Sequence, residues 1–306
     1  MNKAVTNAAV WTTIFLLVQG GLLTTAPALA QQSAQELSVS VAHLKGPLHM
    51  LRGRGGNVVA SVGSDGLLII DDDYPEYATA YQQALSGISP DAATPRFVLN
   101  THWHGDHTGN NNYWGERGAV IIGHKNVLLR MSARQEIKAL GMVVEPSPRS
   151  ALPVVTFDSG LALHFNGDDI EMKHYPSGHT DGDSVVFFSG QNVVHMGDHF
   201  FNDAFPFVDI DSGGSVKGYA DNIQAILNRI DDQTIVVPGH GVLANKADLV
   251  RFHKMIVSTS ELVLAKLASG MTVEAITEQG LGDQWAIWET GFISEAKWIS
   301  FIAAKY

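Results

Sequence analysis

The sequence predicts an α+β fold in which β-sheets are covered by helices. Short alternating or wholly apolar runs separated by glycine-rich turns occupy residues 38–72, as expected of antiparallel sheet. Strand-like and helix-like segments then alternate as far as residue 268, which is typical of layered folds. The chain has 306 residues, 45% hydrophobic and 17% charged, with no Pro/Ser-rich linker and no short-period repeat. We therefore expect one domain over residues 31–306 with a sizeable core.

The expected elements follow the hydrophobic periodicity of the chain in order. After four short strands within residues 38–72, the expected strands are residues 96–100, 119–122, 153–157, 161–165, 169–175, 184–188, 192–196 and 234–241, the last running into a turn. The expected helices are residues 75–87, 124–140, 219–230 and 245–268. Several polar turns come directly after strands, where a rigid sheet can hold chemically active side chains.

The first thirty residues have the layout of a secretory signal peptide. They contain one lysine, no acidic residue, an apolar stretch from Ala8 to Leu23, and Ala-Leu-Ala before a polar run. We expect cleavage after Ala30 and a periplasmic or secreted protein without stable membrane insertion. The alternative is an uncleaved anchor, because the apolar stretch approaches the roughly 20 residues that span a bilayer. The chain has no cysteine, which excludes disulfides and lipoprotein anchoring.

The net charge argues against one class of partner. The chain has 31 acidic and 20 basic residues, a formal net charge of −11, and Arg52 and Arg54 are not part of a longer basic run. Such a chain binds phosphate backbones poorly. We expect a small-molecule substrate and no nucleic acid, whereas the sequence does not define an oligomeric state.

Residues 101–110, THWHGDHTGN, place three histidines and an aspartate within a short segment. Buried imidazoles and carboxylates need partners, and a metal ion would satisfy all of them. In an extended segment His102, His104 and Asp106 point to one side, because they are two residues apart. His107 turns toward a neighbouring position. One segment cannot complete the coordination shell of a metal ion, so further ligands must come from elsewhere.

Three later turns provide candidates for these ligands. Each contains glycine beside an expected strand: SGHTDGD around His179, MGDHF around Asp198, and PGHG around His240. Six or seven nitrogen and oxygen ligands are too many for one tetrahedral zinc ion, which favours two cations that share a carboxylate. Ligands of this type suit zinc, iron and manganese alike.

These motifs, in this order, resemble the signature of the metallo-β-lactamase superfamily, HxHxDH followed by a histidine, an aspartate and a last histidine. The resemblance covers nearly the whole mature chain and implies a four-layer αββα sandwich with two zinc ions in a cleft at one edge. By this resemblance the first zinc is held by His102, His104 and His179, and the second by Asp106, His107 and His240. Asp198 matches the residue that bridges both metals in glyoxalase-II-like and lactonase-like members. On that position, Asp198 rather than the adjacent His199 is expected to be the ligand.

The resemblance implies an exported zinc hydrolase in which a metal-bridging hydroxide attacks the carbonyl of a small ester, thioester, lactone or amide. Asp106 is the expected proton acceptor or relay. A class B-type β-lactamase is one alternative, although the chain lacks the cysteine ligand of most such enzymes and has Phe201 where they bind the drug with a lysine. A metal-binding accessory protein of a periplasmic quinoprotein system is the other alternative.

Several neighbouring residues have two interpretations each. Asp71 ends an apolar strand and is expected to accept a hydrogen bond from a ligand imidazole and so orient it, with a surface turn as the alternative. Asp72 and Asp73 are expected to lie in that surface turn. Asp183 is expected to belong to a tight turn that positions His179, and LRGRGGN at residues 51–57 is expected to form a mobile hairpin at the cleft mouth.

The apolar group after Asp198 also has two interpretations. Its aromatic residues Phe201, Phe205 and Phe207 are expected to line the substrate cleft, with ordinary core packing as an equally weighted alternative. The remaining histidines are expected to be surface or core residues outside the site. They are His43, His49, His124, His164, His174, His195 and His253.

Overall fold

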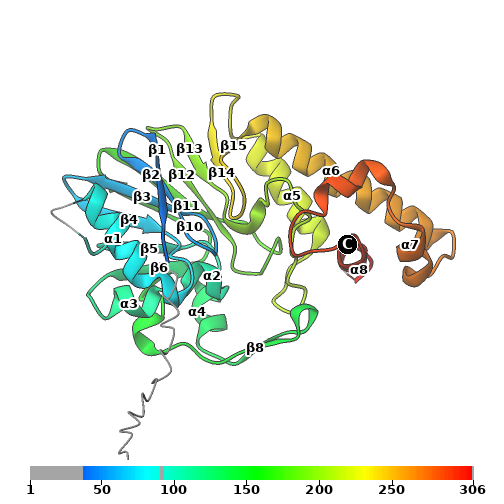
Figure 1. The fold of residues 1–306 in the computed structure, drawn as a ribbon, viewed down its shortest axis with the longest axis horizontal. Coiled ribbons are helices and arrows are strands. Elements are labelled where there is room, and N and C mark those ends of the chain that lie inside the picture. The colour runs from blue at the N-terminus through cyan, green and yellow to red at the C-terminus, as the bar shows by residue number, and fades with distance from the viewer. Residues whose placement is uncertain (1–36, 90–92, 305–306) are drawn as a thin grey trace, which may run out of the picture. The chain divides into compact units, whose positions relative to one another are not determined.

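Two β-sheets lie face to face in the computed structural model, which describes residues 37–89 and 93–304 (Figure 1). The predicted signal peptide and its cleavage after Ala30 lie outside the described residues. In spatial order, the first sheet contains β1 (Ser40–Lys45), β2 (Leu48–Arg52), β3 (Val58–Gly63), β4 (Gly66–Ile70), β5 (Phe97–Asn100), β6 (Val120–His124) and β9 (Val155–Phe157). The second contains β10 (Gly160–Phe165), β11 (Asp168–His174), β12 (Ser184–Phe188), β13 (Val193–His195), β14 (Ile235–Val237) and β15 (Ala244–Asn245).

Both sheets combine antiparallel and parallel pairs. In the first sheet β1 to β4 form an antiparallel meander, with Val59 opposite Ile70, and β4, β5, β6 and β9 then run parallel. In the second sheet only β13 and β14 are parallel, with Val194 opposite Val236. Parallel neighbours bring their carboxyl ends to the same edge of a sheet, so the turns after β4, β5, β13 and β14 are available to build a site there.

The core between the sheets is built from alternate side chains of both. In β4, Leu68 and Ile70 pack against residues of the second sheet such as Phe188, whereas Leu67 and Ile69 pack toward helices on the outer face. This alternation follows from the two-residue period of a strand. Strands that are apolar on both faces must be covered on both faces, which explains the layers that follow.

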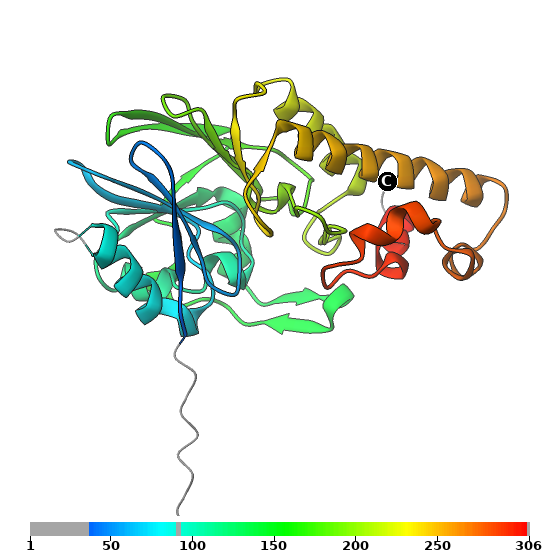
Figure 2. The same ribbon diagram turned by 45° about the horizontal axis from the view of Figure 1, so that its top comes forward.

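Helices cover the outer faces of both sheets (Figures 1 and 2). The first sheet is covered by α1 (Ala78–Ile88) and α3 (Asn111–Gly115), which bury Tyr81, Leu85 and Trp114 against it. The second sheet is covered by α5 (Val216–Leu227) and α6 (Lys246–Ala268). Helices therefore flank two stacked sheets, and the predicted α+β sandwich is confirmed.

The predicted helix 124–140 is wrong in its second half. Helix α4 (Lys125–Met131) is followed by β7 (Gln135–Ile137) and β8 (Met142–Val144), which pair as an antiparallel hairpin. Ser132 donates its hydroxyl to the Leu128 carbonyl (2.6 Å) at the end of the helix, and Gly141 has a left-handed backbone (φ 62°) in the hairpin turn. The apolar residues that suggested a longer helix belong instead to this hairpin.

Two further helices follow α6 and were not predicted. They are α7 (Val273–Gln279) and α8 (Glu295–Ala304). The indole N–H of Trp298 on α8 donates to the Thr259 hydroxyl on α6 (2.9 Å), and both residues are buried. Over the described part of the chain, no helix combines the length and apolarity that a membrane span requires.

Candidate metal centre

The predicted ligands converge at one edge of the sandwich, where strands of both sheets end. From the first sheet, His102 and His104 follow β5, while Asp106 and His107 lie on the short helix α2 (Gly105–Thr108). From the second sheet, His179 lies between β11 and β12, Asp198 lies in the 3₁₀ turn η4 (Gly197–His199) after β13, and His240 follows β14. Residues separated by more than a hundred positions thus meet in one place.

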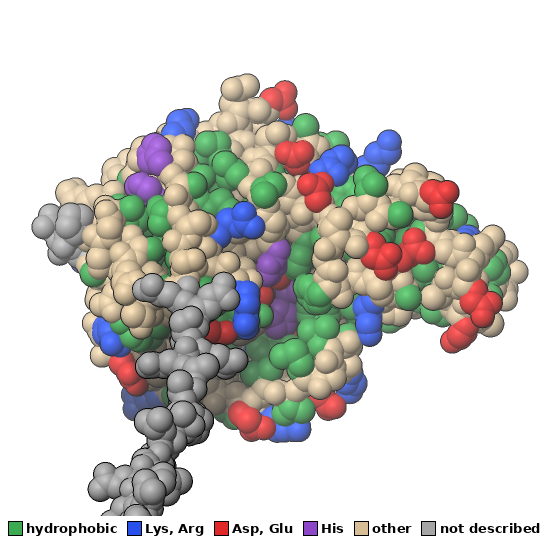
Figure 3. Space-filling view, in the orientation of Figure 1, with side chains coloured by type: hydrophobic (Ala, Val, Ile, Leu, Met, Phe, Trp, Pro, Cys, Tyr) green, Lys and Arg blue, Asp and Glu red, His purple; other side chains and the backbone are tan. Residues whose placement is uncertain are grey.

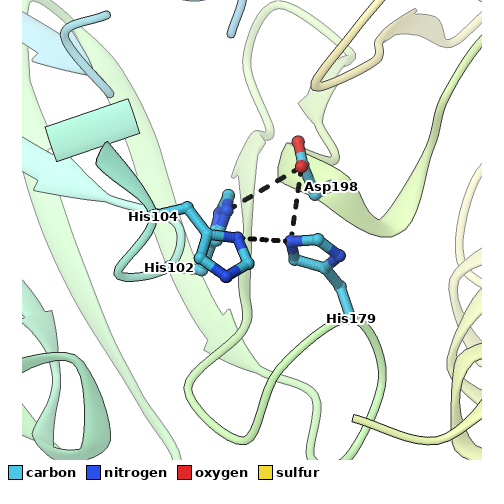
Figure 4. Close-up of side chains that lie close together, drawn as sticks. All are labelled: His102, His104, His179 and Asp198. Atoms are coloured by element: carbon cyan, nitrogen blue, oxygen red, sulfur yellow. Dashed lines mark hydrogen bonds and ion pairs between the residues drawn. The ribbon is translucent and has the colours of Figure 1, made fainter. Parts of the chain in front are cut away.

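Four of these side chains form the first cluster: His102, His104, His179 and Asp198 (Figure 4). The Nε2 atom of His179 is 2.8 Å from Nδ1 of His104 and 3.4 Å from Oδ2 of Asp198. The Nε2 atom of His102 is 3.8 Å from that oxygen. In a tetrahedral zinc site with ordinary bond lengths, neighbouring ligand atoms are about 3.3–3.4 Å apart. The spacing and the complete burial of the cluster fit one ion.

The other three predicted ligands form the second cluster: Asp106, His107 and His240. The Nε2 atom of His240 is 3.3 Å from Nε2 of His107 and 3.3 Å from Oδ2 of Asp106. The Nε2 atom of His107 is 3.7 Å from the same oxygen of Asp106. These spacings resemble the distances between neighbouring ligand atoms around a second ion.

The carboxylate of Asp198 lies between the two clusters. Its Oδ2 atom faces His102 and His179 of the first cluster, at 3.8 and 3.4 Å. Its Oδ1 atom faces His107 and His240 of the second cluster, at 3.1 and 3.5 Å from their Nε2 atoms. One carboxylate therefore offers a different oxygen to each cluster, which is the arrangement that two neighbouring cations share.

Two buried atoms support the fit to metal ions. Nε2 of His102 and Oδ1 of Asp198 have no hydrogen-bond partner among the described residues. Such atoms are rare in folded proteins, and each one calls for an explanation. Imidazole nitrogen and carboxylate oxygen are ligands of zinc, iron and manganese. The residues thus fit a pair of such ions, with the first and second clusters as the two ligand sets and Asp198 between them.

Two imidazoles of the first sheet, those of His107 and His104, are held by a carboxylate on the nitrogen that faces away from the clusters. Nδ1 of His107 is 2.8 Å from Oδ2 of Asp71, which also accepts the Thr101 hydroxyl (2.7 Å), while Oδ1 accepts the Thr101 N–H (2.7 Å). Nε2 of His104 is 3.0 Å from Oδ2 of Asp209. These contacts fix the ring orientation and direct the free nitrogen toward the clusters. The structure thus places Asp71 beside the imidazole of a candidate ligand, His107.

Asp209 was missed in the sequence analysis. It lies in the segment after Phe207, whose carbonyl oxygen is 2.8 Å from Nδ1 of His179. The signal was present, because Asp209 is a carboxylate shortly before the Gly213-Gly214 turn and soon after the Asp198 motif. Only the fold, however, brings it to a histidine more than a hundred residues earlier in the chain.

The placement of Asp72 and Asp73 in a surface turn is wrong. Both side chains are fully buried. Asp72 accepts the Asn110 N–H (2.9 Å), and Asp73 accepts the N–H groups of Arg54 (3.1 Å) and Gly55 (2.8 Å). Other segments cover the strand end that these carboxylates follow, so Asp72 binds the N–H group before α3 and Asp73 binds N–H groups of the loop at residues 53–56 instead of water.

The loop at residues 53–56 is attached along its length. Besides the two contacts with Asp73, the Gly53 N–H donates to the Tyr81 hydroxyl (3.1 Å) and the Gly56 N–H donates to the Asp106 carbonyl (3.0 Å). A Cβ atom at Gly56 would lie 2.2 Å from Cε1 of His107. The predicted hairpin at residues 51–57 is the turn between β2 and β3, and these contacts anchor it. Glycine is needed at Gly56 because the loop presses against the ring of His107, a candidate ligand.

The two clusters differ in their electrostatics. Burial and the neighbouring His107 hold the pKa of His102 well below its usual value, and burial lowers the pKa of His179 to about 4. In the second cluster, burial opposes charge, but Asp198 and Asp106 raise the pKa of His240 to about 9, and Asp198 raises that of His107. Without a metal ion, protons on His107 and His240 balance the negative charge of the carboxylates. Metal binding at the second cluster would therefore release protons.

A cavity of about 710 Å³ opens directly onto the clusters, and Figure 3 shows it as a hollow with histidine at its base. Four metal-ligand candidates contribute to its lining: His104, Asp106, Asp198 and His240. Apolar side chains form much of the remaining wall. Phe207 lines the cavity as predicted, but Phe201 and Phe205 do not.

The other two aromatic side chains are buried behind the cavity wall. Phe201 stacks on the His240 ring (5.0 Å between centroids), and Phe205 packs against Trp298 (6.0 Å). For these two residues, the alternative of core packing is correct. Phe201 nevertheless supports the ring of a ligand candidate from behind.

His199 points away from the clusters. Its Nε2 atom lies 3.1 Å from Nδ2 of Asn222 and 3.8 Å from Oδ2 of Asp183. Asp183 also accepts the Thr180 N–H (2.9 Å), and it closes the turn that presents His179. Adjacent residues at the end of β13 thus face opposite ways, with Asp198 in the site and His199 behind it.

Comparisons with known proteins agree with the fold described above. The family model for the metallo-beta-lactamase superfamily matches residues 51–240. An uncharacterized protein of Mycobacterium tuberculosis is 32% identical over 161 residues, which cover 48% of this chain and 70% of that protein. The fold is similar to the DIM-1 metallo-beta-lactamase (TM-score 0.58, 16% identity, 72% of this chain, 98% of that chain). It is also similar to the sec-alkylsulfatase Pisa1 from Pseudomonas sp. (0.64, 14%, 86% and 49%).

Proposed function

Because the chain belongs to the metallo-β-lactamase superfamily, we propose that it is an exported, zinc-dependent hydrolase of a small ester, thioester, lactone or amide. The observation that carries the proposal is the position of Asp198. Its two oxygens face two different ligand clusters at the base of a cavity of about 710 Å³. When bound there, a pair of zinc ions supplies an activated water molecule and polarises a carbonyl group.

The residues of the chain have separate tasks in this proposal. His102, His104 and His179 bind one ion, and His107, His240 and Asp106 bind the other. Asp71 and Asp209 orient two of these rings through the nitrogen that does not face the cluster.

Asp106 is the residue proposed to move a proton. It lines the cavity, and its side chain is 21% exposed, so it can reach a substrate. Burial opposes the charge, but His107 and His240 lower the pKa of Asp106 to about 2. The carboxylate is therefore ionised at neutral pH, which a metal ligand requires, and it would relay a proton rather than retain it.

Export is supported by the N-terminal sequence alone. The single lysine, the apolar stretch and Ala30 before a polar run suit a cleaved leader. The N-terminal residue of the protein recovered from a periplasmic fraction tests this part, with Gln31 expected. Recovery of the uncut chain in the membrane fraction would contradict it.

The hydrolase proposal is tested by metal content and a substrate panel on the same sample. The panel contains esters, thioesters, lactones and β-lactams. Asp198→Asn and His102→Ala are expected to lower bound zinc and to abolish turnover of any substrate found. Asp72→Asn is the matched control, because Asp72 is buried nearby and accepts the Asn110 N–H, and among the described residues its side chain forms no hydrogen bond or ion pair with a ligand candidate.

Each result has a clear meaning. Turnover that survives complete chelation of the metal would refute the proposed mechanism. Turnover of β-lactams alone would identify the β-lactamase alternative. A fully zinc-loaded protein that hydrolyses nothing in the panel would refute the hydrolase proposal and favour the accessory protein.

A further inference from the structure

The β7–β8 hairpin, residues 135–144, forms one wall of the cavity. Its side chains Ile137, Leu140, Met142 and Val144 all line the cavity. Trp103, Phe207 and Phe292 line it from other segments. Figure 3 shows apolar side chains beside and below the histidines at the base of the hollow. The wall of the cavity and the metal-ligand clusters therefore face the same space.

Several of these apolar side chains are exposed. Leu140, Met142 and Phe292 have exposed fractions of 37%, 48% and 63%. Single exposed apolar residues need no explanation, but apolar residues that converge on one cavity indicate a surface that binds a ligand. Among the described lining residues, Arg54 is the only lysine or arginine, and it is paired with Glu76 at 2.9 Å. The wall thus suits an uncharged, apolar group.

The hairpin is held in place at its turn. The Lys138 N–H donates to Asp211 (2.9 Å), and Nζ of Lys138 lies 3.2 Å from the same carboxylate. Nζ of Lys297 on α8 donates to the carbonyl oxygen of Ala139 (3.0 Å). The wall is therefore formed before a ligand arrives, so a ligand does not have to order it.

We propose that the substrate carries an apolar hydrocarbon group, for which an octanoyl chain is the probe, and that this group lies against the hairpin and Phe292 while the substrate carbonyl lies at the metal-ligand clusters. This inference deepens the proposed function and rests on it for the site of reaction. If the apolar side chains of this wall were made polar, the preference for a longer hydrocarbon chain would weaken or disappear.

The hairpin itself provides a matched pair of variants. Met142 and Val143 are adjacent and have nearly equal exposed fractions, 48% and 49%. Successive residues of a strand face opposite sides, and of these two only Met142 lines the cavity. Met142→Ser therefore changes the wall, whereas Val143→Ser changes the opposite face. Phe292→Ser and Ile287→Ser, at 63% and 64% exposed, form a second pair. Exposed positions of this kind tolerate substitution without loss of the fold.

Two measurements on the zinc-loaded protein test the inference. Calorimetry compares the Kd of octanoate with that of butyrate, which has the same carboxylate. Kinetics compares kcat/KM for the p-nitrophenyl esters of the same two acids. A buried methylene is worth up to about fourfold in affinity, and the cavity is partly open. We therefore expect octanoate and its ester to be preferred at least about tenfold. Met142→Ser and Phe292→Ser should reduce that ratio at least about threefold, and their controls should keep it.

The two measurements separate this inference from the proposed function. Octanoate that binds no better than butyrate, or a ratio that Met142→Ser and Val143→Ser change equally, would overturn the inference even if esters are hydrolysed. A chain-length preference in binding that depends on Met142, without any ester hydrolysis, would support the apolar wall and count against the hydrolase.

Discussion

Replacement of Asp71 by asparagine is expected to weaken metal binding at the second cluster. The carboxylate is fully buried and accepts three hydrogen bonds, from the Thr101 N–H, the Thr101 hydroxyl and Nδ1 of His107. When Nε2 of His107 binds a metal ion, Nδ1 carries the proton and needs an acceptor. Asparagine keeps the shape of the side chain but offers one acceptor oxygen and one NH₂ donor.

The geometry allows no satisfactory orientation of the new amide. If the NH₂ group takes the place of Oδ2, it faces the N–H of His107. If it takes the place of Oδ1, it faces the backbone N–H of Thr101. A buried donor without a partner costs about 1–3 kcal/mol. Loss of such an orienting carboxylate typically lowers metal affinity about 10- to 100-fold. This loss corresponds to about 1.4–2.8 kcal/mol of binding free energy, which is similar to the cost of the unpaired donor.

Competition with a chromophoric chelator measures this effect as a change in the zinc affinity of the second cluster. Asp72→Asn is the control, because burial holds the pKa of Asp72 well above its usual range and an amide resembles the neutral acid. We expect Asp71→Asn to lose about 10- to 100-fold in affinity and Asp72→Asn to lose little. Wild-type affinity in Asp71→Asn, or equal losses in both variants, would refute the reasoning.

Two further predictions concern packing and pH. Gly56→Ala should displace the His107 ring, because the added Cβ would lie 2.2 Å from its Cε1 atom, and zinc content should fall to at most one ion per chain. Gly87→Ala on α1, where a Cβ meets nothing within 4 Å, should keep full zinc content and raise the free energy of unfolding by up to about 1 kcal/mol. Burial and the stacked His174 ring lower the pKa of His124 from 6.5 to about 4, so the unfolded chain binds more protons between these values and stability falls as the pH drops from 6.5 toward 4. In urea unfolding of the zinc-free chain, the stability difference between wild type and His124→Asn should shrink over this pH range, and a constant difference would contradict the assigned shift.

Hydrophobic periodicity was enough to predict most of the fold. The strands of both sheets and the long helix α6 have strong two-residue or helical patterns, and short-range sterics favour the same structure as the tertiary packing. The hairpin at residues 135–144 was missed because its apolar residues are shared between a cavity wall and the core, with Met142 exposed in the cavity and Ile137 buried in the core. Residues that bind a ligand follow the shape of that ligand, so their spacing carries no reliable period.

The metal-ligand candidates were recognisable because each lies in a polar turn next to a strand. Their partners were harder to predict. Asp209 and the buried Asp72 and Asp73 have no local signal that separates them from surface turns, since their burial depends on segments such as α2 and the loop at residues 53–56. Phe201 and Phe205 show the same limit for apolar residues, because sequence cannot distinguish the wall of a cavity from the core behind it.

The division of the ligands between the sheets has a consequence for how the protein matures. His102 to His107 come from the first half of the sandwich, and His179, Asp198 and His240 come from the second. Contacts between residues this far apart in the chain form slowly, because the entropy cost of closing a large loop comes before the contacts can stabilise the fold. Neither half holds the complete ligand set of either cluster, so a metal ion would be bound tightly only after the halves have docked, and it would then link the two halves.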